Sequence, residues 1–232
     1  MVAQNWGPGP PQADRPSARH PAPSVGVAQA SSSMLALLPP GATAFEVSLA
    51  TEDLPPGPRR REEFLAGRAA ATAALGGLDL DGHVGQDADR RPVWPAGVVG
   101  SIAHCGHLAV AVAAPGSNVR ALGVDVEDLA DIGRELTEVV LTPAEQRALA
   151  GSGVPALLGV YFSAKESAFK CWSPLLGVGL DWPDIEVGLD HSAGAFTALV
   201  VGPTARLVAT PVHGRYAVRD AHVLSAAWVN CS

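Results

Sequence analysis

Two carboxylates, Asp125 and Glu127, stand two residues apart in a stretch that alternates strictly with apolar residues. The alternation predicts a strand with Leu122, Val124 and Val126 on one face and both carboxylates on the other. Carboxylates side by side repel each other unless a cation neutralises them. Oxygen ligands at this spacing suit Mg²⁺, which takes one or two carboxylates and completes its shell with water and phosphate oxygens. An ordinary solvated strand face would show the same pattern.

A second group of charges lies further along the chain, in a segment whose apolar residues follow a helical period. Lys165 falls within the apolar stripe, where an unpaired ammonium is costly, so it needs a carboxylate or phosphate partner. Glu166 and Lys170 are i,i+4 neighbours and project together. The helix could therefore bring a third carboxylate to Asp125 and Glu127, and a lysine to a phosphate. An ordinary surface ion pair explains Glu166 and Lys170 but not Lys165.

Lys165 and Lys170 are also the only two lysines among the 16 basic residues of the chain. In a sequence rich in Ala, Gly, Pro and Arg, their retention indicates positions where a compact ammonium is needed and a planar guanidinium does not serve. Chance clustering is the alternative interpretation.

Arginines of an upstream segment offer a grip for a phosphate. Arg61 and Arg68 are seven residues apart and nearly eclipsed on an expected helix, and Arg60 lies toward the same side. With Arg90 and Arg91 in the following loop, they could bind a phosphate in bidentate fashion. A solvated basic face paired with neighbouring glutamates is an equally good interpretation.

Histidines and cysteines give a weaker signal. His104, Cys105 and His107 lie in an expected turn and lack a third soft ligand nearby. We therefore expect a polar turn contact or a phosphate donor here rather than a zinc site. The three cysteines of the chain are odd in number and lack CxxC spacing, so neither a disulfide scaffold nor a zinc ribbon is expected.

The elements that must position these residues form two helix-and-strand series that break near Ala121. Residues 1–33 are rich in proline and are expected to be a disordered leader, and Met34 is a candidate natural start. In the first series, 34–120, we expect strands at 42–50, 98–102 and 108–114, a helix at 60–75 and a loop at 78–97. In the second, 121–232, we expect a strand at 121–127, helices at 132–140, from Thr142 and at 154–172, and strands at 184–189, 195–201, 205–211 and 215–229.

Composition narrows the class of protein. The 232 residues suit one sizeable domain or two small halves, and 47% hydrophobic with 17% charged residues is typical of folded chains. The net charge of −7 argues against a nucleic-acid backbone as the main partner. No apolar run reaches the length of a membrane helix, and 34–38 is too short for a signal-peptide core. We expect a cytoplasmic enzyme with neither a nucleic-acid nor a membrane partner.

Five blocks, in order along the chain, carry a family resemblance. Gly123–Glu127 with Phe162–Lys170 resembles the paired signature of the 4′-phosphopantetheinyl transferase superfamily. The upstream blocks Arg60–Arg68, Arg90–Pro95 and Gly100–Cys105 resemble the branch typified by the enterobactin synthetase component D. The resemblance implies two similar α+β halves around a pseudo-twofold axis, with the ligand site between them. It implies transfer of the 4′-phosphopantetheine arm of coenzyme A to a serine of an apo acyl or peptidyl carrier protein, with release of adenosine 3′,5′-bisphosphate.

The same resemblance implies roles for individual residues. Asp125, Glu127 and Glu166 would hold Mg²⁺, or Mn²⁺, against the pyrophosphate of coenzyme A. Lys170 would contact the pyrophosphate, and Lys165 would orient the motif or neutralise charge. Glu166, directly or through water, would take the serine proton. The nucleotide end, notably its 3′-phosphate, would be held by Arg60, Arg68, Arg90 and His104.

Two positions depart from the family pattern. Ala103 stands where many relatives carry a hydroxyl residue, so no side-chain hydrogen bond is expected there, and Phe162 replaces a frequent tryptophan. The rival functions are a Mg²⁺-dependent phosphoesterase or nuclease, which the net charge disfavours, and a non-catalytic coenzyme A-binding module. Two internal halves make a monomer sufficient. The carrier protein that is served stays open.

Overall fold

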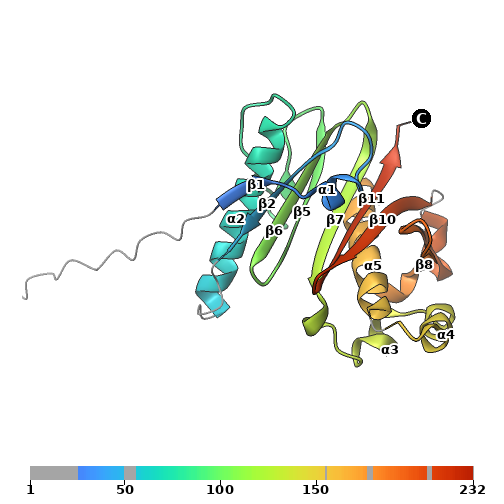
Figure 1. Cartoon of the computed structure of the whole chain (residues 1–232). Helices are drawn as coiled ribbons and strands as arrows, with labels where there is room; N and C mark the ends of the chain where they lie inside the picture. The colour runs from blue at the N-terminus through green and yellow to red at the C-terminus, as the bar shows by residue number, and fades with distance from the viewer. Residues whose placement is uncertain (1–25, 50–55, 155, 177–179, 208–210, 232) are drawn as a thin grey trace, which may run out of the picture.

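Two antiparallel sheets, each covered by one long helix, make up the computed structural model of the chain (Figure 1). The structure describes residues 26–49, 56–154, 156–176, 180–207 and 211–231. The arrangement confirms an α+β fold of two helix-on-sheet halves. Within these ranges, no helix is both long enough and apolar enough to cross a membrane.

The N-terminal half holds a four-stranded sheet in the order β1-β2-β6-β5. Its strands are β1 Gly26–Gln29, β2 Thr43–Ser48, β5 Val98–Cys105 and β6 Leu108–Pro115. Helix α2, Pro56–Gly76, packs on this sheet through small side chains that let it approach closely, since Ala66, Ala70 and Ala71 are at most 1% exposed. The expected helix at 60–75 is confirmed and begins one turn earlier, with Pro56 in its first turn.

The C-terminal half holds a five-stranded sheet in the order β7-β11-β10-β9-β8. Its strands are β7 Val119–Asp128, β8 Ile185–Asp190, β9 Ala195–Val200, β10 Val212–Arg219 and β11 His222–Asn230. The helices of this half are α3 Leu136–Val140, α4 Pro143–Ser152 and α5 Leu157–Leu176, with 3₁₀ turns η1 Leu129–Asp131, η2 Trp182–Asp184 and η3 Gly202–Leu207. Thr142 caps α4, because its hydroxyl accepts from the Glu145 N–H at 3.3 Å while Glu145 accepts from the Thr142 N–H at 2.7 Å.

The two halves share a core. Met34, Val112, Val124 and Leu224 belong to one buried apolar cluster, although they come from segments far apart in the sequence. The edge strands β5 and β7 lie side by side where the two sheets meet (Figure 1). The sheets therefore change between β6 and β7, at 116–118, slightly before the expected break near Ala121.

The expected disordered leader over residues 1–33 is wrong for its last part. Gly26–Gln29 pairs with β2 as an antiparallel edge strand, and the Ser31 side chain caps the short helix α1, Ser32–Leu35. Ala30 and Met34 are buried in the shared core. This order depends on a distant pairing partner, which composition does not reveal. Residues 1–25 of the expected leader lie outside the described residues.

Other boundaries also differ from expectation. The expected strand at 205–211 is wrong over its described part, where η3 runs to Leu207 and contains Pro203, which lacks an N–H for a sheet ladder. The segment 215–229 belongs to the hairpin of β10 and β11, which turns at Asp220 with φ of 54°. The expected helix at 132–140 is limited to Leu136–Val140. The expected loop at 78–97 contains a short hairpin whose strands are two residues long each, β3 Gly85–Gln86 and β4 Pro92–Val93.

Candidate active site

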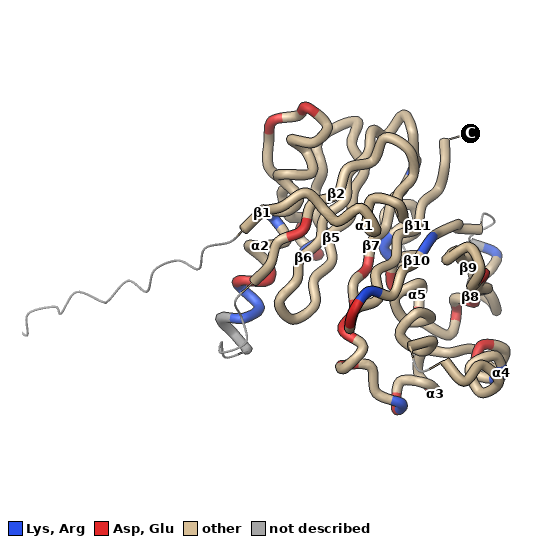
Figure 2. The backbone as a smooth tube through the Cα atoms, in the orientation of Figure 1, with Lys and Arg blue, Asp and Glu red and all other residues tan. Residues whose placement is uncertain are grey.

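Strand β7 presents its two faces as the alternation predicts. Leu122, Val124 and Val126 are at most 2% exposed and belong to the core shared by the halves. Asp125 and Glu127 lie on the other face, the one that α5 covers. In Figure 2, acidic positions follow β7 to its end.

Helix α5 lies directly on this face because β7 has a glycine at the crossing point. A β-carbon at Gly123 would overlap the Ser167 carbonyl oxygen and would lie 2.7 Å from the backbone nitrogen of Cys171. Only glycine permits this approach. The crossing brings Glu166 and Lys170 of α5 next to the carboxylates of β7.

Three buried serines fix the position of α5 along the sheet. The Ser225 hydroxyl on β11 lies 2.8 Å from the Ser163 hydroxyl and 3.0 Å from the Ser167 hydroxyl, and it donates to the Ser163 carbonyl at 2.8 Å. All three side chains are fully buried. Ser225 is also the cross-strand neighbour of Asp125, so this cluster connects α5 to the acidic face.

Lys170 pairs with the first of the two carboxylates. Its Nζ lies 2.6 Å from Asp125 Oδ1. Burial alone would lower the pKa of Lys170, but Asp125 and the neighbouring glutamates hold that pKa above its ordinary value. Burial, and next the charge of Asp125, raise the pKa of Glu127 to about 8, against the lowering effect of Lys170. One lysine therefore does not offset the burial and mutual repulsion of these carboxylates, and the ionised form of Glu127 is disfavoured.

Lys165 has the carboxylate partner that its place in the apolar stripe requires. Its Nζ is fully buried, lies 2.6 Å from Glu145 Oε2, and donates to the carbonyls of Val140 at 2.7 Å and Trp182 at 3.1 Å. Burial lowers the pKa of Lys165, and Glu145 offsets part of that shift. The ion pair thus connects α5 to the end of α3, the start of α4 and η2.

Glu145 is a residue that sequence reasoning left out of the site. Besides Lys165 and Thr142, it accepts from the Val187 N–H at 2.7 Å, and it is 2% exposed. Its position three residues after Thr142 is typical of a helix cap, but that spacing does not predict a buried ion pair.

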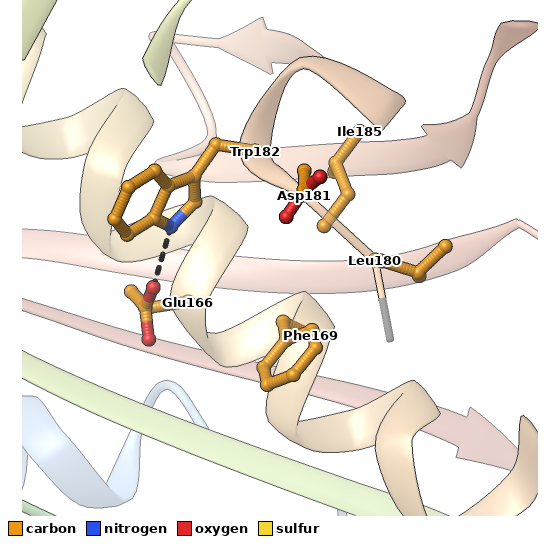
Figure 3. A pocket seen from close by; sticks show the side chains of 6 residues that line it. All are labelled: Glu166, Phe169, Leu180, Asp181, Trp182 and Ile185. Atoms are coloured by element: carbon orange, nitrogen blue, oxygen red, sulfur yellow. Dashed lines mark hydrogen bonds between the residues drawn. The ribbon is translucent and has the colours of Figure 1, made fainter. Parts of the chain in front are cut away.

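Glu166 is held by a tryptophan. The indole Nε1–H of Trp182 donates to Glu166 Oε1 at 2.6 Å (Figure 3). The two residues line a small pocket of about 180 Å³ whose other walls come mainly from the apolar side chains of Phe169, Leu180 and Ile185. The Glu166 carboxylate therefore lies beside an apolar surface.

The donor set for a cation is only partly assembled. Among the described residues, no group of three His, Cys, Asp or Glu side chains is arranged to hold a metal ion. Asp125 Oδ2 is nevertheless buried and lacks a hydrogen-bond partner in the described part of the chain. A buried, unpartnered carboxylate oxygen is unfavourable unless a cation or donor reaches it.

A second region of the site lies on the N-terminal half. Arg68, Arg90 and His104 line one cavity of about 420 Å³, between α2, β5 and the β3–β4 hairpin. Arg90 has a φ of 67°, an uncommon conformation for a residue with a side chain. Arg60 is exposed and is not among the described residues that line this cavity.

A larger cavity of about 520 Å³ connects the two regions. Lys170 of α5 and Arg120 of β7 line it on one side, and Arg91 with β5 lines it on the other. Pro92 and Ile102 line both cavities, so the cavities adjoin along β5. The structure thus places the predicted Arg68, Arg90, His104 and Lys170 along two adjoining cavities, which we together call the cleft.

Family models match both halves. The model of the 4′-phosphopantetheinyl transferase N-terminal domain matches residues 56–114, and that of the 4′-phosphopantetheinyl transferase superfamily matches residues 121–224. The first range holds α2, β5 and most of β6, and the second runs from β7 through α5 to the start of β11.

Curated relatives that bear the name 4′-phosphopantetheinyl transferase match this chain, and so does an enterobactin synthase component. The 4′-phosphopantetheinyl transferase Svp of Streptomyces mobaraensis is 40% identical over 63% of this chain and 62% of its own length. Enterobactin synthase component D of Escherichia coli (strain K12) is 44% identical over 49% of this chain and 55% of its own length. The 4′-phosphopantetheinyl transferase PptT of Mycobacterium tuberculosis is 30% identical over 72% of this chain and 78% of its own length. The chain thus spans between half and two thirds of the first two relatives.

Proposed function

The chain belongs to the 4′-phosphopantetheinyl transferase superfamily, and from this premise we propose that it transfers the 4′-phosphopantetheine arm of coenzyme A to a serine of an apo carrier protein. The observation that carries the proposal is the crossing of α5 over Gly123, which gathers Glu166 and Lys170 beside Asp125 and Glu127. A non-catalytic coenzyme A-binding module has no need of three carboxylates gathered beside one lysine.

We assign the divalent cation to the acidic face. Asp125, Glu127 and Glu166 would hold Mg²⁺, or Mn²⁺, because both ions take oxygen ligands. The buried, unpartnered Oδ2 of Asp125 supports this assignment among the described residues. When bound, the cation would neutralise charge that develops on the leaving phosphate.

The chain's own residues bind and orient the substrate. Arg68, Arg90 and His104 would bind the nucleotide end of coenzyme A, and Lys170 would contact the pyrophosphate at the other end of the cleft. Arg60 lies outside the lining of this cavity and is not assigned to it. The apolar pocket beside Glu166 suits the uncharged pantetheine arm.

In the transfer step, one phosphorus–oxygen bond replaces another. The carrier serine oxygen bonds to the phosphorus that bears the pantetheine arm, the pyrophosphate bridge breaks, and adenosine 3′,5′-bisphosphate leaves. Glu166, directly or through a water, accepts the serine proton. Lys165 does not reach the reacting atoms in this scheme, because Glu145 and two carbonyls engage its buried ammonium. Its role is to position α5.

We further propose that the protein is a monomer, because the two halves of one chain supply both ends of the cleft. The sequence-based expectation of a cytoplasmic enzyme completes this proposal. Carrier proteins are usually acidic, so local basic patches around the cleft would dock them in spite of the net charge of −7.

Intact-mass spectrometry tests the function directly. Purified protein is mixed with coenzyme A, Mg²⁺ and an apo carrier protein, with EDTA and Asp125→Ala as controls. We expect the carrier mass to increase by one phosphopantetheine arm, and the increase to be lost in both controls. Unmodified carriers of the fatty-acid, polyketide and peptide types, with coenzyme A still bound tightly, would leave only a binding module.

A further inference from the structure

Trp182 forms hydrogen bonds with two successive residues of α5. Its carbonyl oxygen accepts from Lys165 Nζ at 3.1 Å, and its indole Nε1–H donates to Glu166 Oε1 at 2.6 Å. The first contact belongs to the buried ion pair with Glu145 and the second reaches the acidic face. One residue therefore connects the structural anchor of the helix to a carboxylate of the site.

Trp182 is itself rigidly placed. It opens η2, where the Asp184 N–H donates to the Asp181 carbonyl at 3.0 Å and the Asp181 N–H donates to the Asp184 carboxylate at 3.2 Å. Its ring packs against Phe162, with centroids 5.7 Å apart at an angle of 56°. A donor with this support restricts the side chain of Glu166, which otherwise has free rotamers on the helix surface.

The hydrogen bond engages one carboxylate oxygen and leaves the other. Figure 3 shows the second oxygen of Glu166 turned away from the indole. Hydrogen bonds from fixed donors to a ligating carboxylate orient it, and removal of such donors weakens metal binding or activity about 10- to 100-fold.

We propose, on the basis of the proposed function, that Trp182 is a positioning residue for Glu166: its indole N–H fixes one carboxylate oxygen so that the other serves the cation and the carrier serine. The indole acts on the reaction only through Glu166. Substitution of the donor and substitution of the acceptor therefore affect the same interaction.

A double-mutant cycle tests this dependence with Mn²⁺ as the probe. Trp182→Phe removes the N–H and keeps an aromatic ring, and Glu166→Ala removes the acceptor. Mn²⁺ binding is measured by electron paramagnetic resonance without coenzyme A or carrier. We expect Trp182→Phe to weaken Mn²⁺ binding about tenfold in the wild-type background and to have no further effect in the Glu166→Ala background. Trp228→Phe, on β11, is the matched control and should leave the affinity unchanged.

A second measurement leaves Trp182 in place. In ¹H–¹⁵N spectra, the indole signal that Trp182→Phe removes should shift in Glu166→Gln and on Mg²⁺ addition to the wild-type protein, while the Trp228 signal stays in place. Equal Mn²⁺ affinities for the wild type and Trp182→Phe, tighter binding by Trp182→Phe, or an indole signal insensitive to Glu166→Gln would overturn the inference. Absence of Mn²⁺ binding by the wild type would overturn both the inference and the metal assignment. Tenfold weaker binding with no carrier modified would overturn the transferase function alone.

Discussion

The two ends of the cleft are built in opposite ways. On the N-terminal half, Arg68, Arg90 and His104 line a cavity, and the Arg68 Nη1 atom is buried without a hydrogen-bond partner among the described residues. On the C-terminal half, Lys165 and Lys170 are already paired with carboxylates at 2.6 Å. Among the described residues, Arg68 and Arg90 thus have no ion-pair partner, and His104 lies 3.8 Å from Glu63. The lysines of the C-terminal half have positions that are fixed before any ligand binds.

This difference suggests that one half of the protein mainly binds the nucleotide and the other mainly catalyses the transfer. Arginines without an ion-pair partner can form charge-assisted hydrogen bonds with the phosphates of a nucleotide, and they contribute to binding. Groups that handle charge in a transition state must keep their geometry, and fixing them in the folded protein removes the cost of reorganisation. We therefore expect substitutions in the C-terminal half to affect stability and turnover together, and substitutions in the N-terminal half to affect binding alone.

The largest expected effect is the loss of the buried ion pair. Lys165→Met leaves Glu145 charged and buried, and we expect it to lower the free energy of unfolding by about 3–5 kcal/mol. Urea denaturation followed by circular dichroism measures this change. The exposed pair of Arg91 and Asp89 is the matched comparison, and Arg91→Gln should cost less than about 1 kcal/mol. Similar losses of unfolding free energy in both variants would show that the charges of the C-terminal half contribute no more to stability than an exposed ion pair does.

The crossing of α5 over β7 comes next. Gly123→Ala introduces a β-carbon where the Ser167 carbonyl lies, so we expect about 2–3 kcal/mol of destabilisation. Transfer activity should fall about 100-fold as the carboxylates separate from Lys170. Gly188→Ala on β8 is the control, because an added β-carbon there would come no nearer than 4.0 Å to a described atom, the Thr197 carbonyl oxygen. Thermal unfolding and single-turnover kinetics compare the two variants. Full activity in Gly123→Ala would show that the helix crossing does not position the carboxylates for transfer.

Local patterns predicted the parts of the site that depend on near neighbours. The faces of β7, the cap at Thr142 and the need of Lys165 for a partner each depend on spacing within one element, and the structure bears them out. The identity of that partner, Glu145, required α4 and α5 to meet in space, which no periodicity within either helix specifies.

The same limit applies to Trp182 and Arg60. Trp182 follows α5 across residues 177–179, which lie outside the described ranges, and its hydrogen bond to Glu166 depends on how the chain returns to the helix. Arg60 shares a helix face with Arg68 in the sequence, but α2 extends beyond the cavity, and only Arg68 lies at its lining. Helical spacing predicts on which face of a helix a residue lies, but it does not predict how far along that helix a cavity extends.

A smaller effect is expected from the serine cluster. Ser225→Ala removes contacts with Ser163 and Ser167, so we expect a loss of about 1–2 kcal/mol in stability. Turnover should fall about tenfold with an unchanged KM for coenzyme A, because α5 loses its fixed position while the nucleotide cavity does not change. Ser192→Ala, in an exposed turn of the same half, is the control. A change in KM without a change in kcat would contradict the division between the two ends.

The smallest expected effect on stability, and the one that defines the N-terminal end, concerns its arginines. Arg68→Ala and Arg90→Ala should each weaken binding of adenosine 3′,5′-bisphosphate about tenfold, because each removes one charge-assisted contact with a phosphate. The free energy of unfolding of Arg90→Ala should stay within about 0.5 kcal/mol of the wild type. Arg68→Ala also loses the contact with the Phe64 ring, and its loss of unfolding free energy should stay within about 1 kcal/mol. Arg60→Ala, on the same helix but outside the lining of the cavity, should change the dissociation constant less than about twofold. Isothermal titration calorimetry distinguishes these cases. If Arg60→Ala weakens binding as much as Arg68→Ala, the nucleotide extends along α2 beyond this cavity, and the helix-face spacing locates the binding end better than the cavity lining does.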